Sequence, residues 1–138
     1  RLKLLGAISK QGGVKEKAAR LVSLASEIPL AQDAHDRAKA NLGVQERLLG
    51  EREDILLSLV DGKNAEARKG ALLIAKQQDR DWQQLVNIIN TVRGQVLDAA
   101  LALEKGKREW AVLTIQIRVF TATLDFLAGA QEGETGHE

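Results

Sequence analysis

The residues that could do chemistry in this chain are few, and the first group is an acidic segment around a histidine. Asp33 and Asp36 are three residues apart, which on a helix places two carboxylates on one face, as a metal site requires. His35 follows a different direction around such a helix and points away from that face. We therefore interpret these residues as a solvated helix surface. The other histidine, His137, has no candidate partner near it in the sequence.

A second group of carboxylates, Glu51, Asp54 and Asp61, could bind a divalent cation. Helical bundles that hold such ions combine inward-facing carboxylates from several helices with Glu-x-x-His pairs. No histidine lies near Glu51, Asp54 or Asp61 in the sequence. Charged surface is the better interpretation, and we expect no metal site.

The densest basic cluster comprises Lys105, Lys107 and Arg108, which flank Gly106 and could contact phosphates. It has neither the extended basic stripe nor the stacking aromatics of nucleic-acid-binding surfaces, so we favour a solvated bend. Trp82 follows three charged residues, 79–81, and could form a recognition patch. We expect instead that Trp82 packs against a facing helix.

Composition narrows the function further. The 138 residues contain 20 Lys and Arg against 19 Asp and Glu, so the net charge of +1 favours neither nucleic acid nor an anionic membrane. There is no cysteine for thiolate chemistry, no phosphate-binding glycine loop and no nucleophile elbow. We expect a cytoplasmic protein without enzymatic activity or cofactor. Because no run of about 18 uncharged apolar residues occurs, we expect no membrane-spanning helix.

The same composition predicts an all-α fold, because aliphatic residues and helix formers dominate and there is a single proline. A short apolar cluster over residues 2–8 suggests an additional N-terminal helix, interrupted at Gly12 and Gly13. An amphipathic helix follows, with apolar residues three and four apart: Val14, Ala18, Leu21, Ala25 and Ile28. Pro29 predicts a kink or tight break, after which helical composition resumes to Val60.

A turn is predicted at residues 61–64. Gly62 can end the preceding helix in the left-handed conformation. Asn64 can cap the next helix, with Glu66 placed favourably in its first turn.

From residue 82 onward the chain carries an apolar seam with alternating spacings of three and four. Its members are Trp82, Leu85, Ile89, Val92, Val96, Ala99, Leu103, Gly106, Trp110, Leu113, Ile117, Phe120, Leu124 and Leu127. This pattern predicts one long helix over residues 64–128, which needs an apolar partner. Residues 1–60 can be this partner if the chain folds back on itself. The result is a long antiparallel hairpin, with Pro29 opposite Gly94. The alternative is a four-helix bundle, if the chain turns at Gly106.

A second apolar stripe lies on the opposite side of this helix, formed by Val112, Ile115, Val119, Ala122 and Phe126. A helix that is apolar on two faces is buried on two faces; the cluster over residues 2–8 could cover one face and another subunit the other, which predicts self-association. We select as interaction residues Trp110, Val112, Ile115, Val119 and Phe126. A β-strand over residues 113–119 is the alternative, which we consider weaker because no pairing strand is visible. Residues 1–128 are expected to form one helical domain, followed by a disordered acidic tail at 129–138.

The turn and the start of the following helix carry a resemblance. Residues 62–69 read Gly-Lys-Asn-Ala-Glu-Ala-Arg-Lys, and resemble a G-K-N-x-E-x-R-K signature of small helical coiled-coil proteins encoded by bacteriophages and prophages. The resemblance implies a charged helix before the turn and a long helix after it, without an assigned activity or functional residues. Some of these proteins lie near genes for single-strand annealing or DNA replication. This chain departs from the pattern at Pro29 and in its extra N-terminal helix.

These observations together predict a non-enzymatic helical protein that acts in protein–protein interaction or has a structural role, of phage derivation. The alternative is a nucleic-acid-binding accessory protein in phage recombination or replication, which would use Lys105, Lys107 and Arg108.

Overall fold

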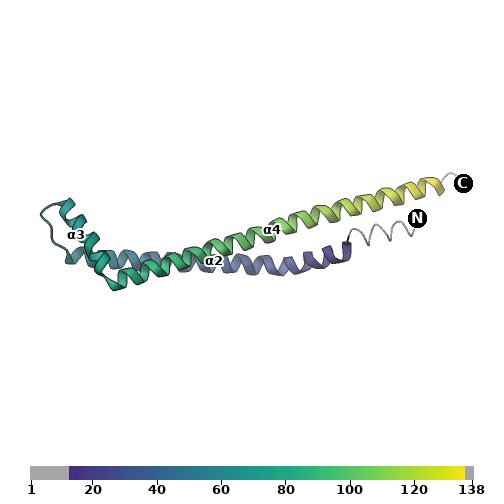
Figure 1. The fold of residues 1–138 in the computed structure, drawn as a ribbon. Helices are drawn as coiled ribbons and strands as arrows, with labels where there is room; N and C mark the ends of the chain where they lie inside the picture. The colour runs from purple at the N-terminus through teal and green to yellow at the C-terminus, as the bar shows by residue number, and fades with distance from the viewer. Residues whose placement is uncertain (1–12, 136–138) are drawn as a thin grey trace. The chain divides into compact units, whose positions relative to one another are not determined.

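The protein is a helical hairpin in a computed structural model that describes residues 13–135, with side chains to residue 131 (Figure 1). Three helices follow one another: α2 (Val14–Leu59), α3 (Ala65–Gln78) and α4 (Arg80–Thr135). Helix α2 packs against α4 in the antiparallel sense, and residues 13–135 contain no strand. The all-α hairpin is therefore confirmed, and the strand considered at 113–119 is wrong. The N-terminal helix expected before Gly12 and the residue His137 lie outside the described residues.

Contacts group the chain into two compact units. The first unit joins residues 1–30 to residues 102–138, and the second comprises residues 31–101. Both long helices contribute to both units, and each unit is described by itself below.

The interior of the first unit is built on Leu24 and Leu103, which are 1% and 7% exposed. On α2, Leu24 is buried while Ala18 and Ala25 are exposed, so the buried face differs by one residue from the expected one. The physical reason is size, because a leucine removes more apolar surface from water than an alanine does.

Gly106 lies inside α4 and marks a close approach between the two helices of this unit. A Cβ atom added to Gly106 would lie 3.4 Å from Cγ1 of Ile28. The residues beside Pro29 therefore face Gly106, and the expected pairing of Pro29 with Gly94 is wrong. Because α4 continues through Gly106, the four-helix alternative is also wrong.

Pro29 does not divide the helix that contains it. Helix α2 begins after Gly13, whose φ of 58° is left-handed, and continues through Pro29 to Leu59. Proline costs a helix one backbone hydrogen bond, but the strong helix formers that follow it sustain the helix. The predicted tight break at Pro29 is wrong, while the start of the helix directly after Gly13 agrees with the sequence.

The second unit has Leu56, Ile89 and Val92 at its centre, each less than 7% exposed. Its turn follows the predicted cap, because the side chain of Asn64 accepts a hydrogen bond from the backbone N–H of Ala67 at 2.8 Å. Gly62, however, is not left-handed. A Cβ atom there would lie 2.6 Å from the backbone nitrogen of Arg68, so glycine is required by a close approach of the chain.

The long helix expected over residues 64–128 is interrupted at Asp79. This residue has extended backbone angles, φ −85° and ψ 117°, and separates α3 from α4. Its side chain accepts a hydrogen bond from the backbone N–H of Trp82 at 2.8 Å, which caps the start of α4. Figure 1 shows α3 inclined to the long helices of this unit.

At its other end, α4 does not stop at Ala128. It continues through Gly129 to Thr135, where we expected a disordered tail from Gly129. Glycine costs a helix only about 1 kcal/mol relative to alanine, and the residues around Gly129 are mostly good helix formers. The last three residues, 136–138, lie outside the described part.

Helix α4 also satisfies the length and composition of a membrane-spanning helix. Residues Arg80–Gln131 include an 18-residue window with a mean hydropathy of 1.5. Between Ala111 and Ala128 the only charged residues are Arg118 and Asp125. A core helix of a soluble protein passes the same test but is mostly buried, whereas no residue of this window is buried; length and composition alone do not assign α4 to a membrane.

Candidate interaction surface

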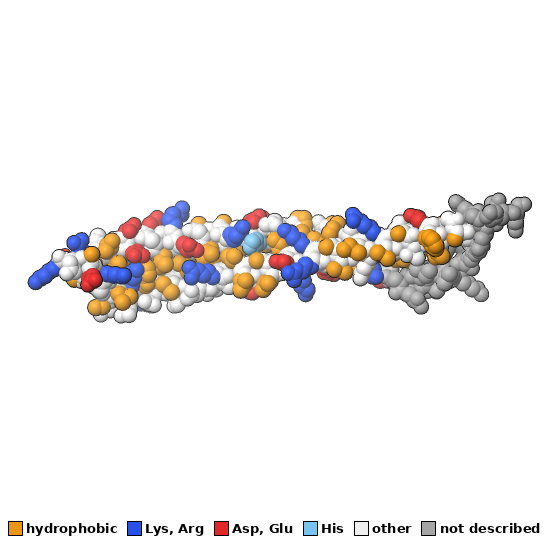
Figure 2. All heavy atoms as spheres, turned by 90° about the horizontal axis from the view of Figure 1, so that it is seen from above, with side chains coloured by type: hydrophobic (Ala, Val, Ile, Leu, Met, Phe, Trp, Pro, Cys, Tyr) orange, Lys and Arg blue, Asp and Glu red, His pale blue; other side chains and the backbone are white. Residues whose placement is uncertain are grey.

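The most prominent feature of the first unit is an apolar face of α4 that stays open to solvent. Its large side chains are Val112, Ile115, Val119 and Phe126, which are 53%, 59%, 61% and 75% exposed. With Ala122, also exposed, they recur at spacings of three and four, and so lie along one side of the helix. We call these five residues the outer face. Figure 2 shows apolar side chains at the surface beside charged ones.

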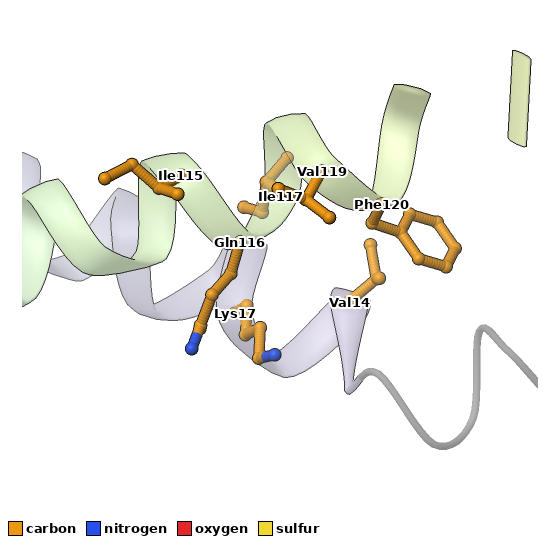
Figure 3. A pocket seen from close by; sticks show the side chains of 7 residues that line it. All are labelled: Val14, Lys17, Ile115, Gln116, Ile117, Val119 and Phe120. Carbon is orange, nitrogen blue, oxygen red and sulfur yellow. The ribbon is translucent and has the colours of Figure 1, made fainter. Parts of the chain in front are cut away.

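The seam on the opposite side of this part of α4 is better covered. Leu113, Ile117, Phe120, Leu124 and Leu127 are all half-buried. The start of α2 meets this side, where Val14 approaches Phe120 (Figure 3). A shallow groove of about 240 Å³ lies there, lined by Val14, Lys17, Ile115, Gln116, Ile117, Val119 and Phe120. Helix α2 thus covers the seam, while Ile115 and Val119 of the outer face border the groove and remain 59% and 61% exposed.

Polar groups beside the outer face present little polarity to a partner. The hydroxyl of Thr123 donates to the backbone carbonyl of Val119 at 2.9 Å, within the same helix. The hydroxyl of Thr114 likewise donates to the carbonyl of Trp110 at 2.8 Å. These bonds satisfy the hydroxyls inside the helix, so desolvating the threonines costs less than desolvating free hydroxyls.

Trp110, which we expected among the interaction residues, lies elsewhere. Its spacing places it with the seam, and it is 39% exposed. The four other interaction residues share the outer face, so the structure brings together Val112, Ile115, Val119 and Phe126 and leaves Trp110 apart.

An ion pair that the sequence did not reveal ties α2 to α4 in the first unit. Nε and Nη2 of Arg20 donate to the two carboxylate oxygens of Glu109 at 2.7 and 2.9 Å, and Nη1 donates to Glu27 at 3.0 Å. The hydrogen bonds from Arg20 hold the pKa of Glu109 below its usual value, and those bonds raise the pKa of Arg20. This two-pronged geometry fixes which residues of the two helices face each other.

The basic cluster Lys105, Lys107 and Arg108 is exposed on α4. Carboxylates accompany it, since Arg108 donates to Glu104 at 2.9 Å and Lys105 acts electrostatically on Glu109. The expected bend at Gly106 is not a helix break. The cluster therefore forms a short patch of mixed charge.

In the second unit, the residues around Trp82 form a joint that connects all three helices. Arg52 of α2 donates to both carboxylate oxygens of Asp79 at 2.8 and 2.6 Å. Lys76 of α3 lies 3.2 Å from a carboxylate oxygen of Glu53 and 4.4 Å from the centre of the Trp82 ring. Trp82 is half-buried in this joint, which supports packing over recognition.

The joint also accounts for the remaining perturbed groups. The guanidinium of Arg52 holds the pKa of Asp79 below its usual value, and the carboxylate raises the pKa of Arg52. Arg52 stands in a charged run of α2, residues 51–54, yet its side chain is only 27% exposed. The apolar periodicity of the sequence does not reveal such a residue, because a charged side chain can pack along its stem while its charged end is paired.

The carboxylates considered as metal ligands do not converge. Asp33 lies 3.0 Å from Arg37, and Asp36 accepts from Gln32 at 3.0 Å, both along α2. His35 is half-buried, and its Nδ1 has no hydrogen-bond partner. Glu51, Asp54 and Asp61 are exposed. In the described part of the chain, no three His, Asp or Glu residues gather where an ion could sit.

No protein-family model, curated protein or solved structure matches this chain.

Proposed function

We propose that this chain is a non-enzymatic, cytoplasmic interaction protein that self-associates through the outer face. The observation that carries the proposal is the 53–75% exposure of four large apolar side chains in one row. They leave roughly 500 Å² of surface open, at the upper end of the ~300–600 Å² that the largest patch of a soluble monomer exposes. Apolar residues at alternating spacings of three and four are the pattern through which helices pair as coiled coils.

The state of the ionisable groups favours a structural role. Among the residues whose side chains are described, the groups with perturbed pKa values are Arg20, Arg52, Asp79 and Glu109, and each is bound to an opposite charge in an ion pair between elements. Catalytic acids and bases need perturbed groups that are free to exchange protons with a substrate. The perturbations here are explained by helix pairing.

Light scattering after size-exclusion chromatography tests self-association. At micromolar concentration we expect a mass at least twice the 15.0 kDa of one chain. Val119→Lys should return the protein to the mass of one chain, because a lysine in the middle of the outer face cannot be desolvated cheaply. Val22→Lys is the matched control, since Val22 on α2 is 74% exposed and lies outside the outer face. A wild-type protein with the mass of one chain rejects the proposal.

The competing function is nucleic-acid binding through Lys105, Lys107 and Arg108, which are three exposed cations within four residues. Glu104 and Glu109 lower the positive potential of the same segment, which argues against it. A filter-binding titration with single- and double-stranded DNA at low salt decides the matter. If the wild-type protein binds DNA and the variants Lys105→Glu and Lys107→Glu do not, nucleic-acid binding replaces self-association as the function.

We also propose that the chain derives from a phage. This derivation is supported by the resemblance of residues 62–69 to the phage-encoded signature. Neighbouring genes test it, because a phage structural or replication operon would support the derivation and a cellular operon would contradict it.

A further inference from the structure

Two isolated charges border the outer face on one side. Arg118 and Asp125 are the only charged residues between Ala111 and Ala128, and both are exposed. They are seven residues apart, so they lie on the same side of α4, two turns from each other. Neither forms an ion pair with another residue whose side chain is described. Opposite charges at this spacing are too far apart to pair within the helix, because partners there are three or four residues apart.

The outer face and its border fit the heptad of a coiled coil. If Val112, Val119 and Phe126 occupy one core position, Ile115 and Ala122 occupy the other. Arg118 and Asp125 then hold the bordering position that directly precedes Val119 and Phe126. In an antiparallel pair of helices, this bordering position of one chain faces the same position of the other chain.

From this geometry we infer that the outer face binds a second copy of this chain in the antiparallel orientation, with Arg118 of each copy opposite Asp125 of the other. The inference rests on the proposed self-association and adds its orientation and register. A two-fold axis makes the ion pair occur twice, once on each side of the axis. One arrangement therefore pairs both isolated charges of both chains.

The same register gives complementary layers in the core. Val119 meets the partner's Ala122, and Ile115 meets the partner's Phe126, so each layer combines a larger with a smaller side chain. Val112 meets the partner's Gly129, where a Cβ atom would have nothing within 4 Å in the single chain. The opposite border places Gln116 against the partner's Thr123, whose hydroxyl is already satisfied within its own helix.

A parallel pair does not match the charges. It places Arg118 opposite Thr123 and Asp125 opposite Ala130, and it stacks Phe126 on the partner's Phe126. At a lipid surface, charges that border an apolar face lie at the headgroups, so a bilayer accepts Arg118 and Asp125 but gives no reason for opposite signs seven residues apart. The antiparallel second copy pairs Arg118 with Asp125 twice and accounts for their signs and spacing.

Cysteine cross-linking tests the orientation, since the chain has no native cysteine. Chains carrying Ile115→Cys and chains carrying Phe126→Cys, mixed after unfolding and refolding, should form a disulfide between unlike chains. Phe126→Cys alone should not, because in the inferred register its two copies lie about 16 Å apart along the axis, beyond disulfide reach. Efficient cross-linking of Phe126→Cys with itself would show a parallel pair and reject the inference, while leaving self-association intact.

Charge reversal tests the register. Arg118→Glu and Asp125→Lys should each weaken the dimer about tenfold, because each places like charges opposite one another at two symmetric points. The double variant should restore the dissociation constant to within about twofold. Lys63→Glu, in the exposed turn, is the matched control and should leave it unchanged. A double variant as weak as the single ones would refute the register.

The outcomes separate the two claims. A wild-type chain that stays single rejects self-association and this inference together. If such a single chain co-sediments with phosphatidylcholine vesicles, the outer face is a lipid-binding surface. A dimer that survives Val119→Lys uses another face, and this too overturns the inference. A dimer with unlike-chain cross-links and charge rescue supports it.

Discussion

The burial of Leu24 makes the packing of the first unit open to a quantitative test. Leu24 is 1% exposed, the lowest value among the described residues, whereas Val22, two residues earlier on α2, is 74% exposed. Leu24→Ala removes three carbon atoms from the interior, worth about 2.4 kcal/mol at ~0.8 kcal/mol per methylene. Two helices without a third layer can close part of the resulting cavity, so we expect a loss of about 2–3 kcal/mol.

Urea unfolding followed by far-ultraviolet circular dichroism measures this loss, with all variants at one chain concentration because association stabilises the folded state. Val22→Ala is the matched control. It removes an exposed side chain and improves helix propensity, so its unfolding free energy should be unchanged or higher by up to about 0.5 kcal/mol. If Leu24→Ala costs no more than Val22→Ala, Leu24 is not buried, and the face of α2 that we assign to the interior is incorrect.

Three further predictions concern the turn and the joint. Asn64→Ala should lower the unfolding free energy by about 1 kcal/mol, since it removes the cap of α3, and urea titration measures it. Gly62→Ala should destabilise the fold by about 1–3 kcal/mol, because its new Cβ would lie 2.6 Å from a backbone atom. Gly70→Ala, in open space within α3, should stabilise it by up to about 1 kcal/mol. In thermal melts, the melting temperature should therefore fall for Gly62→Ala and rise for Gly70→Ala. Asp79 has a lowered pKa in the folded state, so its stabilisation is complete above the unfolded value of about 3.9 and is lost as pH falls through the lower folded value. Asp79→Asn should remove that acid-dependent step from a series of urea midpoints between about pH 7 and pH 2, and an unchanged step would contradict the assignment.

The helical hairpin could be predicted from the sequence because its signals are repeated many times. The seam from Trp82 onward holds its spacing over many turns, and buried residues such as Ile89, Val92 and Leu103 belong to it. The cap at Asn64 is a local signal, and local hydrogen bonding fulfils it. The open outer face likewise follows from a second periodic row.

The register between the helices could not be predicted, for a physical reason. A regular apolar row fits its partner almost as well after sliding by one heptad, so the row itself does not select a register. Close approach at Gly106 and the ion pair between Arg20 and Glu109 mark it in the structure. Both contacts join residues that are far apart in the chain. In the sequence, Gly106 looks like a simple helix interruption and not like a site of close helix packing.

The break at Asp79 was missed because the segment contains neither glycine nor proline. A signal was present, since an aspartate at the cap position followed by an acidic residue in the first turn, here Asp81, is typical of a helix start. Within a charged run, the same residues also look like an ordinary solvated surface. The role of its partner Arg52 could not be predicted for the same reason, because Arg52 also lies within a charged run, residues 51–54.

The joint has a consequence for how the chain tolerates change in length. Oδ2 of Asp79 accepts from both Nε of Arg52 and the backbone N–H of Trp82, so one atom holds α2 and starts α4. Inserting a single residue between Asp79 and Trp82 would break one of these two hydrogen bonds, because one carboxylate cannot keep its position against Arg52 and also move with the start of α4. Insertions at the exposed Asp61 precede both the close approach of Gly62 and the cap at Asn64 and meet no such double demand, so natural length variation should accumulate before Gly62 and be rare around Asp79.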